Sequence, residues 1–218
     1  MRRDIRDAWL PAVRKLGLGV LSPELGPTHW MGPQAARSLR RLLAWVRDGL
    51  GIEAVHAVAG SMGATAALTY AVLHPEDIRS VAALCPATDI GAYHDWCAAH
   101  PGGVRDEIRA AIAAAYGGPP ATAPAVYAAH SAMRRCDRLA MPVLLIHGSA
   151  DGVIPVEQSR RLAGARAGAD GFTYIELNGG DHDAPLHGGR VWTWLRERRD
   201  RAAEPRRERK ECHAESCD

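Results

Sequence analysis

The sequence predicts an α/β domain built on a mostly parallel β-sheet with helices on both faces. Short, unbroken apolar runs alternate with stretches whose apolar residues recur every three or four positions, which is the pattern of buried strands joined by amphipathic helices. The chain has 218 residues, 47% of them hydrophobic, and can therefore enclose one substantial core. We expect one domain over residues 1–199 and a charged, disordered tail over residues 200–218.

The first half of the chain is expected to supply three strands and three helices. Unbroken apolar runs predict strands at residues 18–23, 53–60 and 80–86. The first helix covers residues 4–17, and Pro33 begins a second helix that has leucines along one face and ends near Gly51. A third helix covers residues 62–74, because Pro75 cannot continue it.

The second half begins with an interruption of this rhythm. Residues 88–140 contain an amphipathic helix over residues 104–116, stopped by Gly-Gly-Pro-Pro, and no convincing strand. We therefore expect a helical cap inserted into the sheet domain. The regular order then returns, with strands expected within residues 141–151 and 172–182 and helices at residues 156–168 and 189–199.

Composition argues against several classes of protein. A net charge of +2, with basic residues interleaved among acidic ones, argues against a nucleic-acid partner. No run approaches the roughly 20 apolar residues that a membrane span needs, and the first ten residues lack the apolar core of a secretory signal, so we expect a cytoplasmic protein with no membrane partner. The five cysteines form no disulfide framework. Cys212, His213 and Cys217 lack a second ligand pair, and we expect neither a metal nor another cofactor.

A serine stands among small residues where the strand at residues 53–60 gives way to a helix. The segment is Ala-Gly-Ser-Met-Gly, with Ser61 at its centre. A tight strand-to-helix turn strains its central residue and leaves no room for large neighbours, so small residues must flank it. Such a turn lifts the Ser61 hydroxyl above the carboxyl edge of the sheet, beside the positive end of the next helix. Taken alone, the pattern also fits an ordinary small-residue turn.

An acid and a histidine follow in an order that suits catalysis. Asp151 comes directly after a buried strand, in His-Gly-Ser-Ala-Asp, and His182 comes directly after the last strand. Carboxyl ends of parallel strands meet at one edge of a sheet, so both side chains are expected beside Ser61. Serine, acid, histidine is the chain order of one class of Ser–His–Asp hydrolases.

Other side chains compete for the roles of base and acid. His187 lies five residues beyond His182, and Asp89 follows the preceding strand. We favour His182 and Asp151 because each lies just after the end of its own strand. His147 stands on a strand and is interpreted as a packed, hydrogen-bonded residue.

Three segments together resemble the α/β-hydrolase superfamily, in particular its prolyl-oligopeptidase-like and small-esterase branch. The segments are AGSMGA at residues 59–64, HGSADGVIPVEQSRRLA at residues 147–163 and GGDHDAP at residues 179–185. The resemblance covers residues 5–195. It implies Ser61 as the nucleophile, His182 as general base and then acid, and Asp151 as the group that orients the imidazole. It also implies that the Met62 N–H donates a hydrogen bond to the oxyanion.

The sequence departs from this family at its start. In family members a strand ending in His-Gly precedes the helix that resembles residues 6–17, and its loop supplies the second oxyanion N–H; here Met1 stands at that place. By family topology this strand lies between those resembling residues 19–23 and 56–60, in the middle of the sheet. Either the sequence starts late, which we prefer, or the remaining strands close up around part of an oxyanion hole. The expected fold is therefore an N-terminally truncated α/β-hydrolase.

The expected cap carries four aromatic residues that could define a substrate pocket. They are Tyr93, Trp96, Tyr116 and Tyr127. They are expected either to line an acyl or aryl pocket or to pack the cap onto the sheet.

The main functional hypothesis is a serine hydrolase that cleaves carboxylic esters of small to medium acyl groups. A peptidase or amidase of the prolyl-oligopeptidase-like type is the first alternative, suggested by the Ser-Met-Gly elbow at Ser61 and by the acid loop. A catalytically impaired binding protein that keeps the three residues without the oxyanion strand is the second. The expected partner is a small-molecule ester or amide, and the oligomeric state does not follow from the sequence.

Overall fold

One parallel sheet organises the computed structural model, which describes residues 2–203. Within these residues four strands pair in the order β1, β2, β3, β4, and all of them run in the same direction. They are β1 His56–Gly60, β2 Ser80–Leu84, β3 Val143–Gly148 and β4 Phe172–Leu177. Every residue of the central strands β2 and β3 is buried, which explains why these strands are unbroken apolar runs in the sequence.

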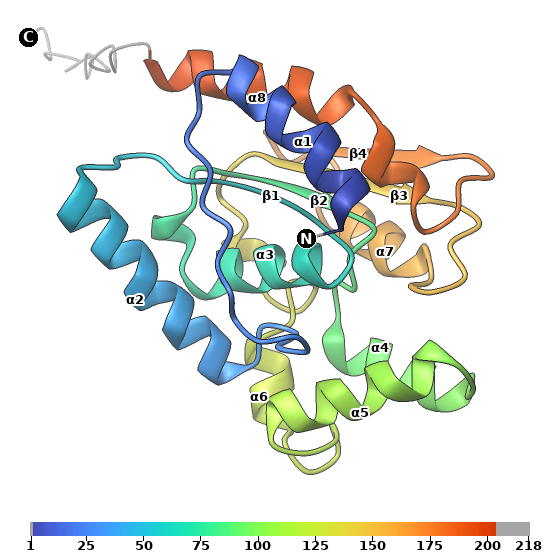
Figure 1. Ribbon diagram of the computed structural model, residues 1–218. Helices are drawn as coiled ribbons and strands as arrows, with labels where there is room; N and C mark the ends of the chain where they lie inside the picture. The colour runs from blue at the N-terminus through green and yellow to red at the C-terminus, as the bar shows by residue number, and fades with distance from the viewer. Residues whose placement is uncertain (1, 204–218) are drawn as a thin grey trace, which may run out of the picture.

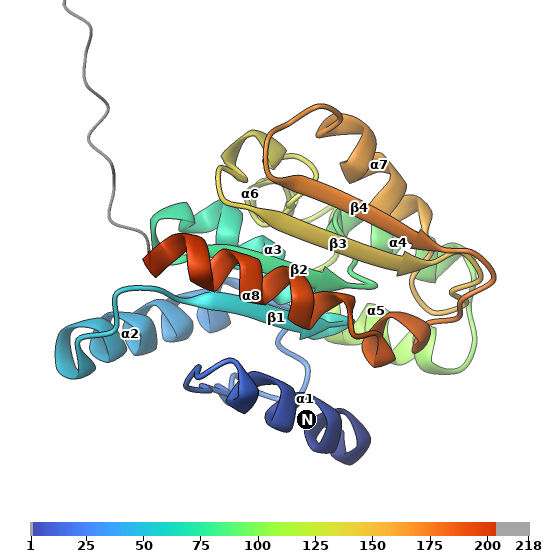
Figure 2. The same cartoon turned by 90° about the horizontal axis from the view of Figure 1, so that it is seen from above.

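Helices cover both faces of the sheet (Figures 1 and 2). The α-helices of the described residues are α1 Arg3–Lys15, α2 Pro33–Leu50, α3 Met62–Leu73, α4 Ile90–Ala99, α5 Val104–Tyr116, α6 Pro124–Ala129, α7 Glu157–Ala165 and α8 Arg190–Ala203. Helices α1 and α8 share one face, where the rings of Trp9 and Trp192 meet edge to face with centroids 5.6 Å apart. Helices α2, α3 and α7 cover the other face. The expected mostly parallel α/β architecture is therefore confirmed.

The segment between β2 and β3 is helical throughout, as expected. Helices α4, α5 and α6 lie on the side of the sheet opposite α1 and α8 (Figure 1). Buried side chains such as Ile112 form a separate apolar cluster there, which reaches Ile154 in the loop after β3. This cluster fixes the cap against the loop that carries Asp151.

The prediction of a strand at residues 18–23 is wrong. This segment pairs with no strand of the described chain, and Val20 and Leu21 remain about half exposed. A strand is stabilised by the backbone N–H and C=O groups of a neighbour, and local apolar sequence cannot supply that neighbour. In the described residues the sheet ends at β1, so it holds no interior gap.

The C-terminal helix is longer than the sequence predicts. Helix α8 extends through Ala203, beyond the expected domain limit at residue 199. The remainder of the expected tail, residues 204–218, lies outside the described residues, and so do Cys212, His213 and Cys217. None of the described helices is long and apolar enough to span a bilayer.

A strained turn precedes α2 and is hydrogen-bonded to the cap. Trp30 and Met31 both have positive φ angles, of 37° and 52°, which bulky side chains rarely adopt. The Tyr116 hydroxyl donates to the Trp30 carbonyl at 3.0 Å, and His130 Nδ1 donates to the Met31 carbonyl at 2.8 Å. Two hydrogen bonds from the inserted segment therefore hold this turn in place.

We predict that Gly32→Ala destabilises the fold by about 1–3 kcal/mol, the usual cost of overpacking. A Cβ at Gly32 would lie 2.2 Å from the backbone oxygen of Ala115, so α2 and α5 must separate. The free energy of unfolding in urea measures the effect. Gly19→Ala is the matched control, because a Cβ there meets nothing within 4 Å. Equal losses in both variants would contradict the prediction.

Candidate active site

β1 carries Ser61 to the carboxyl edge of the sheet. Ser61 has φ 55° and ψ −126°, a conformation outside both the strand and the helix that it joins. Its N–H donates to the Leu84 carbonyl at 2.8 Å, and its own carbonyl accepts from the Thr65 N–H at 3.0 Å. A Cβ at Gly60 would lie 2.2 Å from Leu186 Cδ2, so any larger residue before the serine would require the Leu186 side chain to move.

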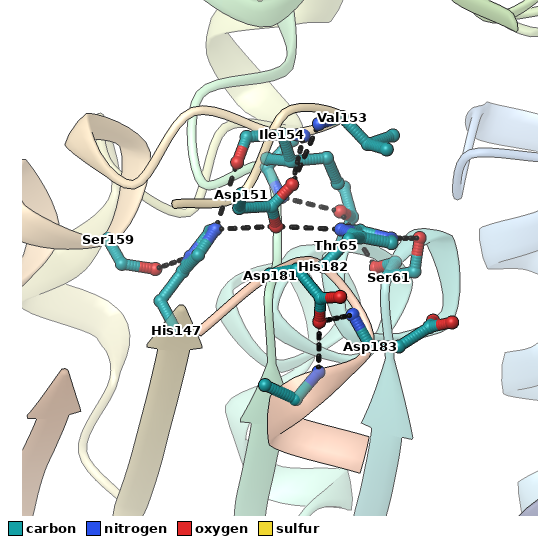
Figure 3. A network of polar contacts seen from close by, with 12 residues as sticks. Ser61, Thr65, His147, Asp151, Val153, Ile154, Ser159, Asp181, His182 and Asp183 are labelled. Atoms are coloured by element: carbon teal, nitrogen blue, oxygen red, sulfur yellow. Dashed lines mark hydrogen bonds and ion pairs between the residues drawn. The ribbon is translucent and has the colours of Figure 1, made fainter. Parts of the chain in front are cut away.

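The structure brings Ser61, His182 and Asp151 into one chain of hydrogen bonds (Figure 3). His182 Nε2 lies 2.9 Å from Ser61 Oγ, and His182 Nδ1 lies 2.7 Å from Asp151 Oδ2. Since the carboxylate only accepts, Nδ1 carries the proton and Nε2 is free to accept from the serine hydroxyl. The three residues are far apart in the sequence and meet because their strands end at the same edge.

Asp151 is a fully buried carboxylate whose two oxygens accept four N–H groups. Oδ1 accepts from the backbone of Val153 at 2.8 Å and of Ile154 at 2.9 Å. Oδ2 accepts from His182 Nδ1 and from His147 Nε2, the latter at 3.1 Å. Burial raises the pKa of Asp151, but the hydrogen bonds from His147, His182 and Ile154 outweigh it, and the pKa falls well below 3.8. The carboxylate therefore stays ionised at neutral pH.

The basicity of His182 is set by its neighbours. Burial lowers the pKa of His182, whereas the hydrogen bond and negative charge of Asp151, together with contact with the Cys85 thiol, raise it above 6.5. The protonated imidazole is therefore stabilised beside Asp151. In its neutral form, a ring of raised basicity is suited to take a proton from Ser61.

His147 lies in the candidate site and contacts Asp151, which the sequence analysis did not predict. Its side chain is fully buried, and its Nε2 donates to both Asp151 Oδ2 and the Ile154 carbonyl, the latter at 3.0 Å. Its Nδ1 lies 2.7 Å from Ser159 Oγ on α7, so the serine hydroxyl donates to Nδ1 and keeps the proton on Nε2. His147 is thus packed and hydrogen-bonded, as expected, but its partner is the acid. Its position four residues before Asp151 is the signal that could have indicated this.

The rival residues lie in other environments. His187 is exposed at the end of the short 3-10 helix Ala184–His187. Asp89 is buried, caps α4 by accepting from the Ala92 N–H at 3.2 Å, and pairs with Arg134. Neither His187 nor Asp89 therefore takes part in the hydrogen bonds that join Ser61, His182 and Asp151.

The four aromatic residues pack within the cap and connect it to neighbouring segments. Tyr93, Tyr116 and Tyr127 are buried, and their hydroxyls donate to the backbone carbonyls of Val153, Trp30 and Gly118. Trp96 is partly exposed, and its ring stacks on those of Tyr93 and His100. A substrate-lining role stays a prediction for all four. The Tyr93 hydroxyl contacts the loop that also donates to Asp151, which links the cap to the acid.

Comparison with known proteins places this geometry in a wider context. A model of the α/β hydrolase fold matches residues 26–104, which include the Ser61 turn. Together with the parallel sheet and the matching solved structures, this decides the fold. The chain has the α/β-hydrolase fold. None of the curated proteins matches it.

Solved structures with this fold include both esterases and peptidases. An esterase from Pyrococcus furiosus shares 15% identity with a TM-score of 0.62, over 90% of this chain and 77% of that one. A monoacylglycerol lipase from Paleococcus ferrophilus shares 20% identity with a TM-score of 0.52, over 76% and 75%. A puromycin-hydrolysing peptidase from Mycobacterium tuberculosis shares 23% identity with a TM-score of 0.57, over 78% and 24%. The chain spans about a quarter of the length of the puromycin-hydrolysing proteins that it matches.

We predict that His147→Ala lowers both stability and catalysis. Removing the ring takes one of the two N–H donors from Asp151 Oδ2 and the acceptor from the Ser159 hydroxyl. The expected cost is about 1–3 kcal/mol in the free energy of unfolding. With the acid less firmly oriented, kcat/KM for an ester falls as well. His147→Gln, whose amide N–H can still donate, is expected to restore part of both.

The control for this variant is His56→Ala. His56 makes a similar bond, from Nδ1 to Ser80 Oγ at 2.7 Å, at the amino end of β1 and away from Asp151. It is expected to lose stability with an unchanged kcat/KM. An unchanged kcat/KM in His147→Ala would show that His147 is only a packing residue.

Proposed function

We propose that this chain is a serine hydrolase that cleaves carboxylic esters of small to medium acyl groups. The observation that supports it most is the 2.9 Å contact between Ser61 Oγ and His182 Nε2, with the Nδ1 nitrogen 2.7 Å from a buried, ionised Asp151. This is the arrangement that activates a serine nucleophile. No residue in it requires a metal or a cofactor for that step.

In the proposed reaction, Ser61 Oγ attacks the ester carbonyl while His182 Nε2 takes its proton. Asp151 stabilises the imidazolium that forms and keeps the other ring nitrogen protonated. His182 then returns the proton to the leaving alkoxide, which departs as an alcohol and leaves an acyl-serine. Water, deprotonated by the same nitrogen, releases the acid and restores Ser61.

The oxyanion would be stabilised by the beginning of α3. Met62 is the first residue of that helix, and the first N–H groups of a helix have no partner inside it. The Met62 N–H directly follows the nucleophile and is therefore the proposed donor. The positive end of the helix adds to the stabilisation.

A peptidase or amidase is the second candidate. The same three residues can cleave an amide, and the solved structures with this fold include a peptidase beside the esterases. An amide nitrogen must be protonated as it leaves, whereas an ester oxygen is a better leaving group. Parallel turnover of nitrophenyl esters and aminoacyl anilides separates the two, and the proposal predicts faster turnover of the esters.

We predict that a fluorophosphonate probe labels the purified chain at Ser61. The probe reacts only with an activated serine, because its phosphorus needs a deprotonated oxygen as the attacking atom. Labelling is read by gel fluorescence, and the modified peptide is identified by mass spectrometry. Ser61→Ala is expected to lose the label and all ester turnover.

Ser22→Ala is the matched control for this experiment. Ser22 is exposed and lies outside the hydrogen-bonded chain, so its removal is expected to leave labelling unchanged. Full labelling of a folded Ser61→Ala chain would contradict the proposal. Absent labelling of the folded natural sequence would favour a binding protein over an enzyme.

A further inference from the structure

A sulfur, an oxygen and a nitrogen atom that could bind a metal ion lie close together inside the proposed active site. They belong to Cys85, Asp151 and His182. Cys85 directly follows β2, at the same sheet edge as Ser61. Its Sγ, a carboxylate oxygen of Asp151 and a ring nitrogen of His182 all lie within 4.8 Å of one another. Cys85 is completely buried, as is the Asp151 side chain, whereas His182 is partly exposed. In the proposed ester hydrolysis the Cys85 thiol neither forms a bond with the substrate nor transfers a proton.

These three groups have the chemistry of a zinc site. Thiolate, imidazole and carboxylate are the usual protein ligands of Zn²⁺, at about 2.0–2.3 Å from the metal, so the ligand atoms around a tetrahedral ion lie roughly 3.3–3.7 Å apart. Side-chain movements of about an ångström would bring the present atoms to that spacing. Burial among protein groups also favours a soft, partly dehydrated ion over Mg²⁺, which keeps its waters.

We propose that Cys85, Asp151 and His182 form an inhibitory Zn²⁺ site. Binding depends on these residues alone, whereas the inhibition rests on the proposed hydrolase function. His182 would bind through Nδ1, the nitrogen that already faces the Asp151 carboxylate at 2.7 Å. The hydrogen bond from His147 uses another position on Asp151 Oδ2 and is retained.

The proton balance explains why such an ion would stop catalysis. Cys85 loses its thiol proton to solvent and binds as a thiolate. The His182 ring stays neutral, and its proton moves from Nδ1 to Nε2 as the metal takes Nδ1. The charges of Zn²⁺, one thiolate and one carboxylate then sum to zero, which suits a buried site. With a proton on Nε2, His182 donates to Ser61 Oγ and cannot act as its base.

Metal binding is tested without reference to activity. We would use the full chain with Ser61→Ala and with Cys212 and Cys217 changed to serine, so that neither the nucleophile nor the tail cysteines contribute. Co²⁺ serves as a coloured substitute for Zn²⁺, and calorimetry then measures Zn²⁺ itself. The expected results are a thiolate-to-metal charge-transfer band and one bound ion per chain.

Cys85→Ser is the decisive variant, because it removes the soft sulfur and keeps the shape of the side chain. It is expected to lose the charge-transfer band and to raise the Kd for Zn²⁺ by at least about 10- to 100-fold. Cys97→Ser, which changes another buried cysteine in α4, is expected to keep both. Circular dichroism checks folding, and Cys85→Ala and Asp151→Asn provide second variants. An unchanged band and Kd in folded Cys85→Ser, or no binding by the parent chain, would overturn the proposal.

Inhibition is measured separately with Ser61 restored. Ester turnover is expected to fall with Zn²⁺, to recover with a chelator and to be unaffected by Mg²⁺. The Cys85→Ser chain, compared with its own zinc-free turnover, is expected to resist Zn²⁺. A chain that hydrolyses esters equally with and without Zn²⁺ refutes the inhibitory site and leaves the hydrolase intact. A chain that binds the ion through Cys85 but turns over no ester refutes the hydrolase and leaves the metal site.

Discussion

The buried negative charge of Asp151 is the constraint on which the rest of the site depends. A carboxylate removed from water is costly unless hydrogen bonds replace its hydration. Four N–H groups do so, from the backbone of Val153 and Ile154 and from the rings of His147 and His182. Each of these donors also gains a fixed position. The charge of Asp151 therefore holds in place the loop after β3, the His182 ring and, through His147, the end of β3.

The parallel strands bring the Asp151 carboxylate, through His182, close to a serine that is far away in the sequence. Ser61, Asp151 and His182 follow β1, β3 and β4, and the common direction of these strands puts all three at one edge. The cap contributes from outside the sheet, because the Tyr93 hydroxyl holds the Val153 carbonyl at 3.1 Å. The geometry at Ser61 is therefore supported from both the sheet and the cap. A change in either is expected to alter catalysis before it unfolds the chain.

Local sequence predicted much of this arrangement, and its failures have a common cause. The turn at Ser61 and the two central strands were predictable, because small residues and unbroken apolar runs are local signals. Residues 18–23 have a similar apolar run but find no partner strand, which only the assembled sheet reveals. His147 was identified as a packed residue, yet its hydrogen bond to Asp151 depends on the path of the loop between them. The individual segments could therefore be predicted from the sequence, whereas the contacts between them could not.

The most direct test of the account is an NMR titration of the His182 ring. The hydrogen bond between Nδ1 and Asp151 predicts a strongly downfield exchangeable proton, absent from His182→Asn. The raised basicity predicts that the ring takes up its second proton with a midpoint above pH 6.5. A natural chain whose downfield spectrum matches that of His182→Asn, or a His182 midpoint below 6.5, would contradict the claim that a buried, ionised Asp151 prepares His182 to activate Ser61.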